Sequence, residues 1–389
     1  MLDSNNKIND KNKIAFVVPG IFLAGGIRVV LELAEGLSDT FDTYVISPYI
    51  NSIWPYRVKI ITPKIPRIAS ATLGIVKKLL RKKGIVDFST LDYAVNSLLG
   101  FRLNEIDALK REIKADIAIA TWYPTFLPVI ESQTKPLILM QDFPELVEEC
   151  CGQPGLRLFR TMLRSPMSFL SISSYTTELI KTENPNARIY YIGNGIDLNK
   201  FYPRRIARDD IPQISVMIRR QRFKGGDIAI NALNDAFKKA KFKALVISEF
   251  EKDEFESRFR PQFPYVYYRS GINDDILARL YSSSDIFLFT SKADNFPLPP
   301  LEAMACGTAV VSIDSKGGIR DYMINGYNAL VAKTKNPDEI ADLLVQALDN
   351  KELRSSLIHG GLETAKKWDF KLVVERTRKA LEEELKYDS

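Results

Sequence analysis

The stretch SKADNFPLPPLEAMACGTAVVSID, residues 291–314, follows the apolar run DIFLFT at Asp285–Thr290 and itself ends in the apolar run TAVVSI. Pro299 and Pro300 suit the first turn of a helix, where a missing N–H costs little, and Gly307 is typical of the residue that ends one. The stretch therefore predicts a strand, a loop, a helix and a second strand. This alternation is typical of a parallel sheet covered by helices.

The same alternation recurs on both sides of this stretch, in two series of short apolar runs. The first series predicts a helix at Ile27–Leu37 and strands at Ile14–Val18, Thr43–Ser47, Asp116–Ala120 and Pro136–Met140. The second predicts strands at ISVMI and KALVIS, and helices at about Asp227–Ala240, at Asp274–Ser283 and near Leu301. Residues 338–387 are helical in pattern almost throughout. We therefore expect an α/β protein.

The chain has 389 residues, more than a single hydrophobic core usually supports, which favours two domains. Between the two series lies YIGNGIDLNKFYPRR, a strand end with a Gly-Asn-Gly turn and a proline-containing link. We place an N-terminal Rossmann-like domain at residues 1–195 and a C-terminal one at 196–370. The last residues, 371–389, are expected to form a helix that packs across to the first domain.

Composition excludes several classes of protein. With 46% apolar and 26% charged residues the chain is typical of a soluble globular protein, and a net charge of +6 argues against a dedicated nucleic-acid binder. The three cysteines have neither a disulfide-framework nor a metal-ligand spacing, which favours a reducing compartment. The polar N-terminus predicts neither a signal peptide nor a membrane span, so we expect a cytoplasmic protein.

Two acids flank the loop and helix of the opening stretch. Glu302 falls in or just after the first helical turn, so its carboxylate is expected near the carboxyl ends of the strands, where open α/β sheets bind ligands. An ionised carboxylate accepts the two hydrogen bonds that a ribose diol donates. An acid stabilised by the helix dipole is the alternative, and the local pattern leaves both interpretations open.

The stretch resembles the E-G-F-G-L-P-x-x-E signature of the retaining family 4 glycosyltransferases, also described as glycosyl transferases group 1. Asp294 and Glu302 stand at its two acidic positions, while Asn295 and Pro297 replace its two glycines. The resemblance implies the GT-B fold, with two Rossmann-like domains facing a central cleft. It also implies that Glu302 binds the nucleotide ribose and that the transferred sugar is held by Asp294, Asn295, Phe296, Pro297 and Leu298.

Further segments match the same family. ISVMIRRQRFKGG resembles its G-R-x-x-x-x-K-G motif, which makes Arg219 and Lys224 the expected ligands of the leaving diphosphate. AGGIRVVLELAEGL resembles its glycine loop, which implies substrate contacts by Gly25, Gly26 and Arg28. Without the resemblance, Gly25 and Gly26 also fit a plain strand-to-helix turn, and Arg219 and Lys224 also fit a solvated basic loop.

The C-terminal half carries one more match. SKGGIRDYMINGYNALV resembles the family's G-G-x-x-E motif, so Gly317 and Gly318 are expected beside the donor and Asp321 at the acidic position.

The acceptor side departs from the family. Many members have a His at the end of one strand, whereas this chain reads LILMQDFPEL there and has a single histidine, His359, in a late helical segment. Gln141 and Asp142 are therefore the acceptor-side candidates. Asp142 is a candidate to orient or deprotonate an acceptor hydroxyl, and capping of the next helix is the alternative.

The resemblance implies a retaining, hexosyl-type glycosyltransferase of polysaccharide biosynthesis, without a metal or cofactor. Its donor is a nucleoside diphosphate sugar and its acceptor a hydroxyl of a glycan, a lipid-linked glycan or a surface glycoconjugate. Three alternatives stay open: a non-catalytic nucleotide-sugar-binding partner, a phosphorylase or an epimerase on the same fold. No nucleic-acid partner is expected.

Two basic segments raise peripheral attachment to the inner membrane face as a further interpretation. One is the cluster Lys77, Lys78, Arg81, Lys82 and Lys83, and the other is GLRLFRTMLRSPMSFL with Arg157, Arg160 and Arg164. Solvated helix faces are the alternative.

Overall fold

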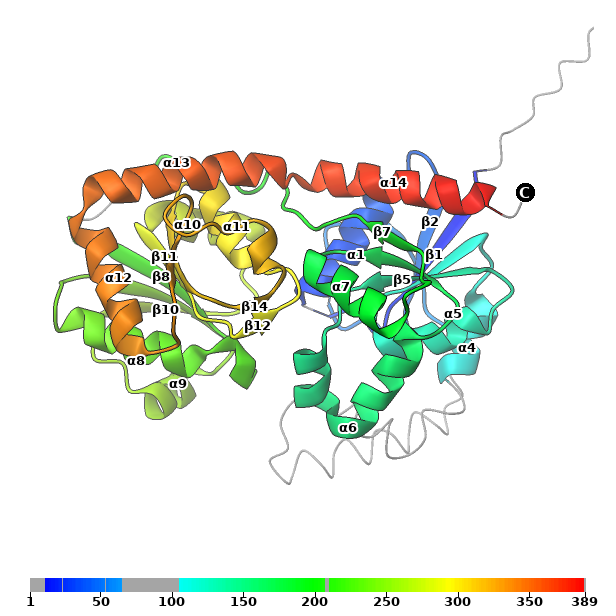
Figure 1. The fold of residues 1–389 in the computed structure, drawn as a ribbon, viewed down its shortest axis with the longest axis horizontal. Helices are drawn as coiled ribbons and strands as arrows, with labels where there is room; N and C mark the ends of the chain where they lie inside the picture. The colour runs from blue at the N-terminus through cyan, green and yellow to red at the C-terminus, as the bar shows by residue number, and fades with distance from the viewer. Residues whose placement is uncertain (1–10, 23, 53, 65–104, 207–209, 388–389) are drawn as a thin grey trace, which may run out of the picture. The chain divides into compact units, whose positions relative to one another are not determined.

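The computed structural model describes residues 11–387 except 23, 53, 65–104 and 207–209. The chain divides into two compact units (Figure 1). Unit 1 contains residues 1–171, 179–191 and 374–389, and unit 2 contains residues 172–178 and 192–373. The basic cluster at residues 77–83 lies outside the described residues.

Unit 1 is built on a parallel sheet in which the described strands follow the order β3-β2-β1-β4-β5-β6-β7. The strands are β1 (Lys13–Val17), β2 (Asp42–Ile46), β3 (Lys59–Ile61), β4 (Ile117–Ala120), β5 (Lys135–Met140), β6 (Ser168–Ser171) and β7 (Ile189–Tyr191). The central strands are buried on both faces, as a parallel sheet between two layers of helices requires.

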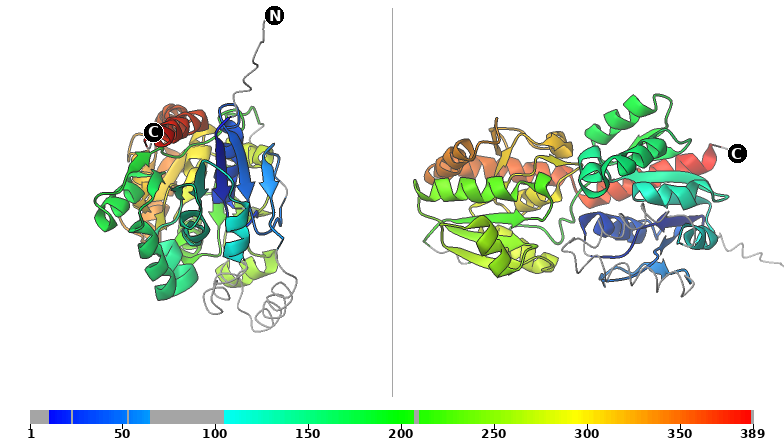
Figure 2. Two further views of the ribbon diagram at one scale, coloured as in Figure 1. Left: turned by 90° about the vertical axis from the view of Figure 1, so that its right-hand side faces the viewer. Right: turned by 90° about the horizontal axis from the view of Figure 1, so that it is seen from below.

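The helices of unit 1 cover both faces of this sheet (Figure 2). They are α1 (Gly25–Gly36), α4 (Glu105–Glu112), the 3₁₀ turn η1 (Tyr123–Thr125), α5 (Phe126–Ile130), α6 (Pro144–Leu163), the second half of α7 (Ser174–Glu183) and most of α14 (Phe370–Lys386). Side chains of α5, α6 and α7 share one core with alternate residues of the strands.

Unit 2 repeats the plan, with described strands in the order β10-β9-β8-β11-β13-β15, all parallel. They are β8 (Gln213–Ile218), β9 (Lys243–Ser248), β10 (Tyr265–Arg269), β11 (Ile286–Phe289), β13 (Ala309–Ile313) and β15 (Leu330–Ala332). A separate parallel pair joins β12 (Ala293–Asp294) to β14 (Lys316–Gly317). This pair lies in the loops that follow β11 and β13.

The helices of unit 2 are η2 (Arg222–Lys224), α8 (Gly226–Phe237), α9 (Lys252–Phe259), α10 (Asp274–Ser283), α11 (Leu298–Ala305), η3 (Gly318–Asp321), α12 (Pro337–Asp349) and α13 (Lys351–Lys367). Helices α8 and α12 share a core with Ile286 and Leu288 of β11. The intervening Phe287 instead meets Tyr281 of α10, with ring centroids 5.3 Å apart. Because side chains alternate along a strand, α10 lies on the other face of the sheet.

The predicted α/β fold class is confirmed, and the order of each sheet is that of a doubly wound Rossmann-type domain. The helix predicted at Asp274–Ser283 is α10, and KALVIS is β9. The strand end predicted before the Gly-Asn-Gly turn is that of β7, whereas strands β3, β6, β10 and β15 were not predicted from the sequence. Of these, β10 (YVYYR) has no residue that is fully buried, so it lacks the apolar run that marks the central strands.

Helix α14 packs on unit 1 from Val374 onward. Lys135 donates a hydrogen bond from Nζ to the backbone carbonyl of Glu384 at 2.7 Å, near the C-terminal end of the helix. A cation there is favourable because the last carbonyls of a helix carry partial negative charge. The guanidinium of Arg188 also lies over the ring of Tyr387.

The structure joins the adjacent residues Cys150 and Cys151 in a disulfide, a pairing that was not predicted from the sequence. They precede Gly152, whose φ of 58° and ψ of −156° interrupt α6. Cys306 is a buried free thiol. A disulfide between neighbours closes no chain loop, so it adds little of the stability that a disulfide framework provides.

One prediction concerns the contact between α1 and α14. A Cβ on Gly36 would lie 2.7 Å from Cγ2 of Val374. We expect Gly36→Leu to destabilise the protein by about 1–3 kcal/mol through overpacking. Urea denaturation checks this, and Gly36→Leu combined with Val374→Ala should recover part of the loss. An unchanged midpoint in the single variant would contradict the tight contact.

Candidate functional site

Each sheet contains a point where the order of strands reverses, and several predicted site residues, among them Gly25, Lys224 and Asp294, follow strands that meet there. In unit 1 these strands are β1 and β4, and in unit 2 they are β8 and β11. Ligands of doubly wound sheets bind outside the carboxyl ends of the strands at such points. The loops after β8 and β11 therefore make unit 2 the natural place to look for a donor site.

Lys224 and Asp294 meet at this point of unit 2. Lys224 ends the turn after β8, Asp294 lies in β12 after β11, and their Nζ and Oδ2 atoms are 2.5 Å apart. Both side chains are largely buried, with 25% and 16% of their surface exposed. The structure thus brings two predicted catalytic residues into one ion pair.

The two loops are also joined through their backbones. Gly225 follows Lys224 with a φ of 68°, and its Cα approaches Thr290 so closely that an added Cβ would lie 2.1 Å from the Thr290 carbonyl oxygen. Thr290 in turn donates a hydrogen bond from Oγ1 to the Gly225 carbonyl at 2.8 Å. Glycine is required here because L side chains rarely adopt this φ.

Gly317 and Gly318 hold the backbone of the predicted sugar-binding loop. Gly317 has a φ of 121°, and an added Cβ would lie 1.7 Å from the carbonyl oxygen of Asp294. The Gly318 N–H donates a hydrogen bond to the Asn295 carbonyl at 2.8 Å. The glycine pair therefore has a structural role that fixes where Asp294 and Asn295 lie.

Phe296, Pro297 and Leu298 continue this loop into α11, and all three are buried. The ring of Phe296 packs against Tyr322 and Trp368, with centroid distances of 5.3 and 5.0 Å. Tyr322 donates a hydrogen bond from its hydroxyl to the Pro297 carbonyl at 2.6 Å. Tyr322 and Trp368 thus hold the loop in place, and the side chain of Phe296 acts in packing.

The side chain of Asn295 is engaged by a residue that sequence reasoning missed. Ser173 donates a hydrogen bond from Oγ to Asn295 Oδ1 at 2.7 Å, and Asn295 is 2% exposed. Next to it, Asp321 accepts a hydrogen bond from the Ser174 N–H at 2.8 Å and another from the Ser174 hydroxyl. An acid at the start of α7 is favoured by the helix dipole. In the sequence, the only indication of a role for Ser173 was its position after an apolar run.

Glu302 lies in α11 and is 3% exposed. Its Oε2 accepts a hydrogen bond from the hydroxyl of Tyr281 at 3.3 Å. A buried carboxylate is costly unless it is hydrogen-bonded, so this contact offsets part of the cost of burying Glu302. Tyr281 was not among the predicted residues.

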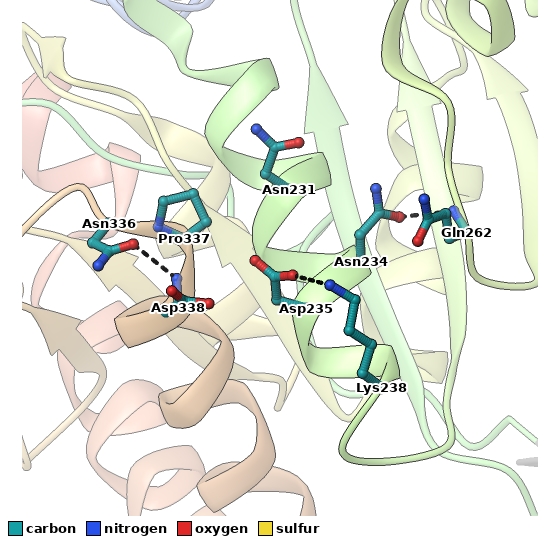
Figure 3. Close-up of a pocket in the computed structure, with 8 residues that line it drawn as sticks. All are labelled: Asn231, Asn234, Asp235, Lys238, Gln262, Asn336, Pro337 and Asp338. Atoms are coloured by element: carbon teal, nitrogen blue, oxygen red, sulfur yellow. Dashed lines mark hydrogen bonds and ion pairs between the residues drawn. The ribbon is translucent and has the colours of Figure 1, made fainter.

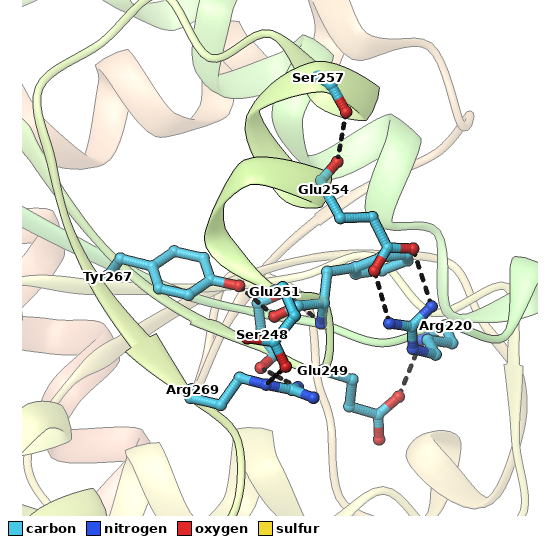
Figure 4. Close-up of polar contacts among 9 residues, drawn as sticks. Arg220, Ser248, Glu249, Glu251, Glu254, Ser257, Tyr267 and Arg269 are labelled. Atoms are coloured by element: carbon cyan, nitrogen blue, oxygen red, sulfur yellow. Dashed lines mark hydrogen bonds and ion pairs between the residues drawn. The ribbon is translucent and has the colours of Figure 1, made fainter.

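Arg219 is paired with an acid, although 41% of its side chain stays exposed. Its NH1 atom lies 2.7 Å from Glu249 Oε1. Glu249 Oε2 accepts the backbone N–H of Arg220 (Figure 4). Arg220 makes two parallel hydrogen bonds to Glu254, at 2.9 and 2.7 Å. The guanidinium of Arg220 is thus held by Glu254. Glu249 was missed, although it directly follows the predicted strand KALVIS.

In unit 1 the structure brings Gly26 and Gln141 together. Gln141 donates a hydrogen bond from Nε2 to the Gly26 carbonyl at 3.0 Å, and an added Cβ on Gly26 would lie 2.8 Å from Gln141 Oε1. Gly25 begins α1 with open space around its Cα, and Arg28 is half-buried in the first turn. The N-terminus of α1 therefore lies at the carboxyl ends of β1 and β5.

Asp142 is buried at the end of β5, with 6% of its surface exposed. Its Oδ2 accepts the backbone N–H of Tyr123 at 2.6 Å. Burial raises the pKa of Asp142 to about 8, and the hydrogen bond from Tyr123 opposes the rise. Helix α6 begins after Phe143 and has no side-chain cap, so capping of that helix is not what holds Asp142.

A hollow of about 390 Å³ lies elsewhere on unit 2, beside α8 and the start of α12 (Figure 3). Its polar groups bond to each other: Lys238 pairs with Asp235 at 2.7 Å, and the Gln262 N–H donates to Asn234 Oδ1. None of the predicted site residues lines it. The hollow is thus separate from the candidate site.

The basic face predicted on residues 155–170 lies on α6. Arg157, Arg160 and Arg164 are exposed there. Arg160 and Arg164 form ion pairs with Glu183 at 3.7 and 2.7 Å. Two of the three charges thus have a partner within the unit, and membrane attachment through this face stays a prediction.

In the described part of the chain, no group of three or more His, Cys, Asp or Glu side chains is arranged to hold a metal ion. None of the helices described has both the length and the apolar composition needed to cross a membrane.

Comparison with known families places a glycosyltransferase domain in the second half of the chain. Residues 205–364 match the family model described as Glycosyl transferases group 1. The matched residues lie within unit 2 and include every predicted site residue of that unit. A domain of this family is therefore present.

Curated relatives match part of the chain. A Campylobacter jejuni N,N'-diacetylbacillosaminyl-diphospho-undecaprenol alpha-1,3-N-acetylgalactosaminyltransferase is 27% identical over 206 residues, which cover 49% of this chain and 53% of that protein. An uncharacterized glycosyltransferase of Methanocaldococcus jannaschii is 27% identical over 160 residues, 41% of this chain and 45% of its own. The matches span about half the length of these relatives.

Solved structures match over nearly the whole chain. Sucrose-phosphate synthase from Thermosynechococcus elongatus has a TM-score of 0.73 at 14% identity and covers 96% of this chain and 99% of its own. An Anabaena protein solved with UDP-glucose has a TM-score of 0.69 at 13% identity and covers 96% and 100%. The chain therefore has the GT-B type of fold, with two parallel-sheet Rossmann-like units.

A second prediction tests the glycine at position 317. Gly326 has a φ of 77° with nothing within 4 Å of an added Cβ, so Gly326→Ala should cost only the left-handed backbone strain of about 1–2 kcal/mol. Gly317→Ala should lower the free energy of unfolding by more than Gly326→Ala does, since its Cβ would also displace the Asp294 backbone. Denaturant unfolding of both variants checks this. Equal losses would show that the approach to Asp294 is not tight.

A third prediction concerns pH. Because the pKa of Asp142 is higher in the folded protein, about 8, than in the unfolded chain, the folded state binds more protons between about pH 4 and 8. This contribution to stability is present at low pH and is lost as the pH rises through 8. Asp142→Asn should remove a stability slope of up to about 1.4 kcal/mol per pH unit. Thermal unfolding of both proteins from pH 5 to 9 measures it, and parallel curves would contradict the raised pKa.

Proposed function

We propose that this protein is a glycosyltransferase that moves a sugar from a nucleoside diphosphate to a hydroxyl group, with unit 2 binding the donor. The observation that carries the proposal is the ion pair of Lys224 and Asp294, with the buried Glu302 in the helix that follows the same loop. The matching Glycosyl transferases group 1 domain supports it.

In this proposal the donor replaces the internal ion pair of unit 2. The diphosphate binds the ammonium group of Lys224 in place of Asp294. The released carboxylate of Asp294 then accepts hydrogen bonds from hydroxyl groups of the sugar. Glu302 accepts from the ribose. Arg219, whose guanidinium NH1 donates to Glu249, adds positive charge beside the diphosphate.

We propose that the reaction retains the configuration at the anomeric carbon. The bond between that carbon and the phosphate oxygen breaks, and a bond to the acceptor oxygen forms on the same face. The acceptor proton passes to the departing diphosphate, whose negative charge Lys224 stabilises. No metal ion or cofactor is part of the proposal, since side-chain cations take the role of the divalent ion.

Unit 1 is proposed to bind the acceptor at the N-terminus of α1 and the end of β5. Asp142 is the candidate to orient the attacking hydroxyl, because its pKa of about 8 allows proton exchange near neutral pH. A lipid-linked glycan is the acceptor class that we favour. The Campylobacter jejuni relative supports this, since its name describes a diphospho-undecaprenol acceptor.

The fourth prediction is a test of the donor site. We expect one nucleoside diphosphate among UDP, GDP, dTDP and ADP, or its sugar, to bind the wild-type protein, and NAD not to bind. Lys224→Ala and Glu302→Gln should each weaken that binding by at least about tenfold, the effect of one charge-assisted hydrogen bond. Isothermal titration calorimetry measures the affinities.

Lys239→Ala is the matched control, because it removes a Lys–Asp ion pair of the same unit, with Asp342 at 2.8 Å, away from the site residues. It should leave affinity unchanged. The ligand found should then support sugar transfer, with the anomer identified by NMR spectroscopy. Binding without turnover on any acceptor would favour a non-catalytic partner, and no nucleotide binding would overturn the proposal.

A further inference from the structure

We propose that Tyr281 is a positioning residue for the donor nucleotide: its hydroxyl fixes the Glu302 carboxylate and so sets the selection of ribose. The inference rests on the proposed function and names a residue that the family resemblance did not supply. Tyr281 lies in the last turn of α10, and Glu302 lies in α11. The contact joins two helices that follow different strands of the sheet.

The contact is enclosed. Tyr281 has no exposed surface and Glu302 is 3% exposed. The Tyr281 hydroxyl donates to Glu302 Oε2 at 3.3 Å. Since water does not compete at such a site, the hydrogen bond contributes to the orientation of the carboxylate.

Tyr281 is itself fixed from several sides. Its ring meets Phe287 of β11 edge-on at 5.3 Å and Phe201 at 6.5 Å. Thr308 donates a hydrogen bond from Oγ1 to the Tyr281 carbonyl at 2.6 Å. A tyrosine has only two side-chain torsions, so these contacts leave the hydroxyl one position.

The chemistry of the pair suits a carboxylate that must stay charged. Burial raises the pKa of Tyr281 well above its usual range, and the charge of Glu302 raises it further. The hydroxyl therefore remains a neutral donor at any pH the protein experiences. A lysine in its place would neutralise Glu302, whereas a tyrosine orients it and uses one of its roughly four acceptor positions.

The experiment compares ribose recognition with recognition of the rest of the nucleotide. The probes are the nucleoside diphosphate that the wild-type protein binds and its 2′,3′-dideoxy form, titrated into each variant by calorimetry. Wild type should prefer the ribose form. Tyr281→Phe should weaken binding of the ribose form about tenfold and leave the dideoxy form unchanged, because only the hydroxyl has been removed.

Two further variants make the result specific. Glu302→Gln should abolish the preference, and adding Tyr281→Phe to it should cause no further loss. Tyr267→Phe is the matched control: it removes a tyrosine hydroxyl of unit 2 that donates to the Phe250 carbonyl at 2.5 Å (Figure 4), and it should keep the wild-type preference.

The outcomes separate the two proposals. If Glu302→Gln abolishes the ribose preference and Tyr281→Phe keeps it, the inference fails while the proposed function stands. Equal weakening of both nucleotide forms by Tyr281→Phe would show a purely structural role and would also overturn the inference. If the wild-type protein binds no nucleoside diphosphate, the proposed function fails and the inference falls with it.

Discussion

The close approach of two backbones, at Gly317 and Asp294, is the constraint on which the candidate donor site depends. The pairing of β12 with β14 ties the loop after β11 to the loop after β13, and the positive φ of Gly317 permits it. Without that tie, Asp294 would lie on an unsupported loop and its contact with Lys224 would have no fixed geometry. A site made of side chains from several loops is accurate only when the loops are held to one another.

Much of this arrangement could be predicted from the sequence, because parallel strands are buried on both faces and give continuous apolar runs. KALVIS and Asp285–Thr290 were identified in this way, and the carboxyl end of the second run placed Asp294 and Glu302 at one edge of a sheet. The pairing of Arg219 with Glu249 was not predictable. It requires β9 to lie beside β8, and an apolar run does not say which strand is its neighbour.

Asp142 shows how a local rule can fail. An Asp two residues before Pro144 is a plausible cap of helix α6. Proline favours the first helical position, however, so Phe143 is the N-cap of this helix. Asp142 then lies outside the helix and is bound by the Tyr123 N–H from the neighbouring strand's loop. Likewise, the disulfide of Cys150 and Cys151 depends on the local backbone beside Gly152, which the spacing of cysteines does not encode.

The ion pair between Lys224 and Asp294 also has a consequence for selectivity. Asp294 is the negative partner of Lys224, so any incoming anion must compete with a carboxylate that is already tethered. An ion with one charge gains little from the exchange, because it replaces one negative partner of Lys224 with another. In the proposed function a diphosphate carries more charge, and its sugar would re-engage the displaced Asp294. We therefore expect the site to ignore the common inorganic anions of its surroundings.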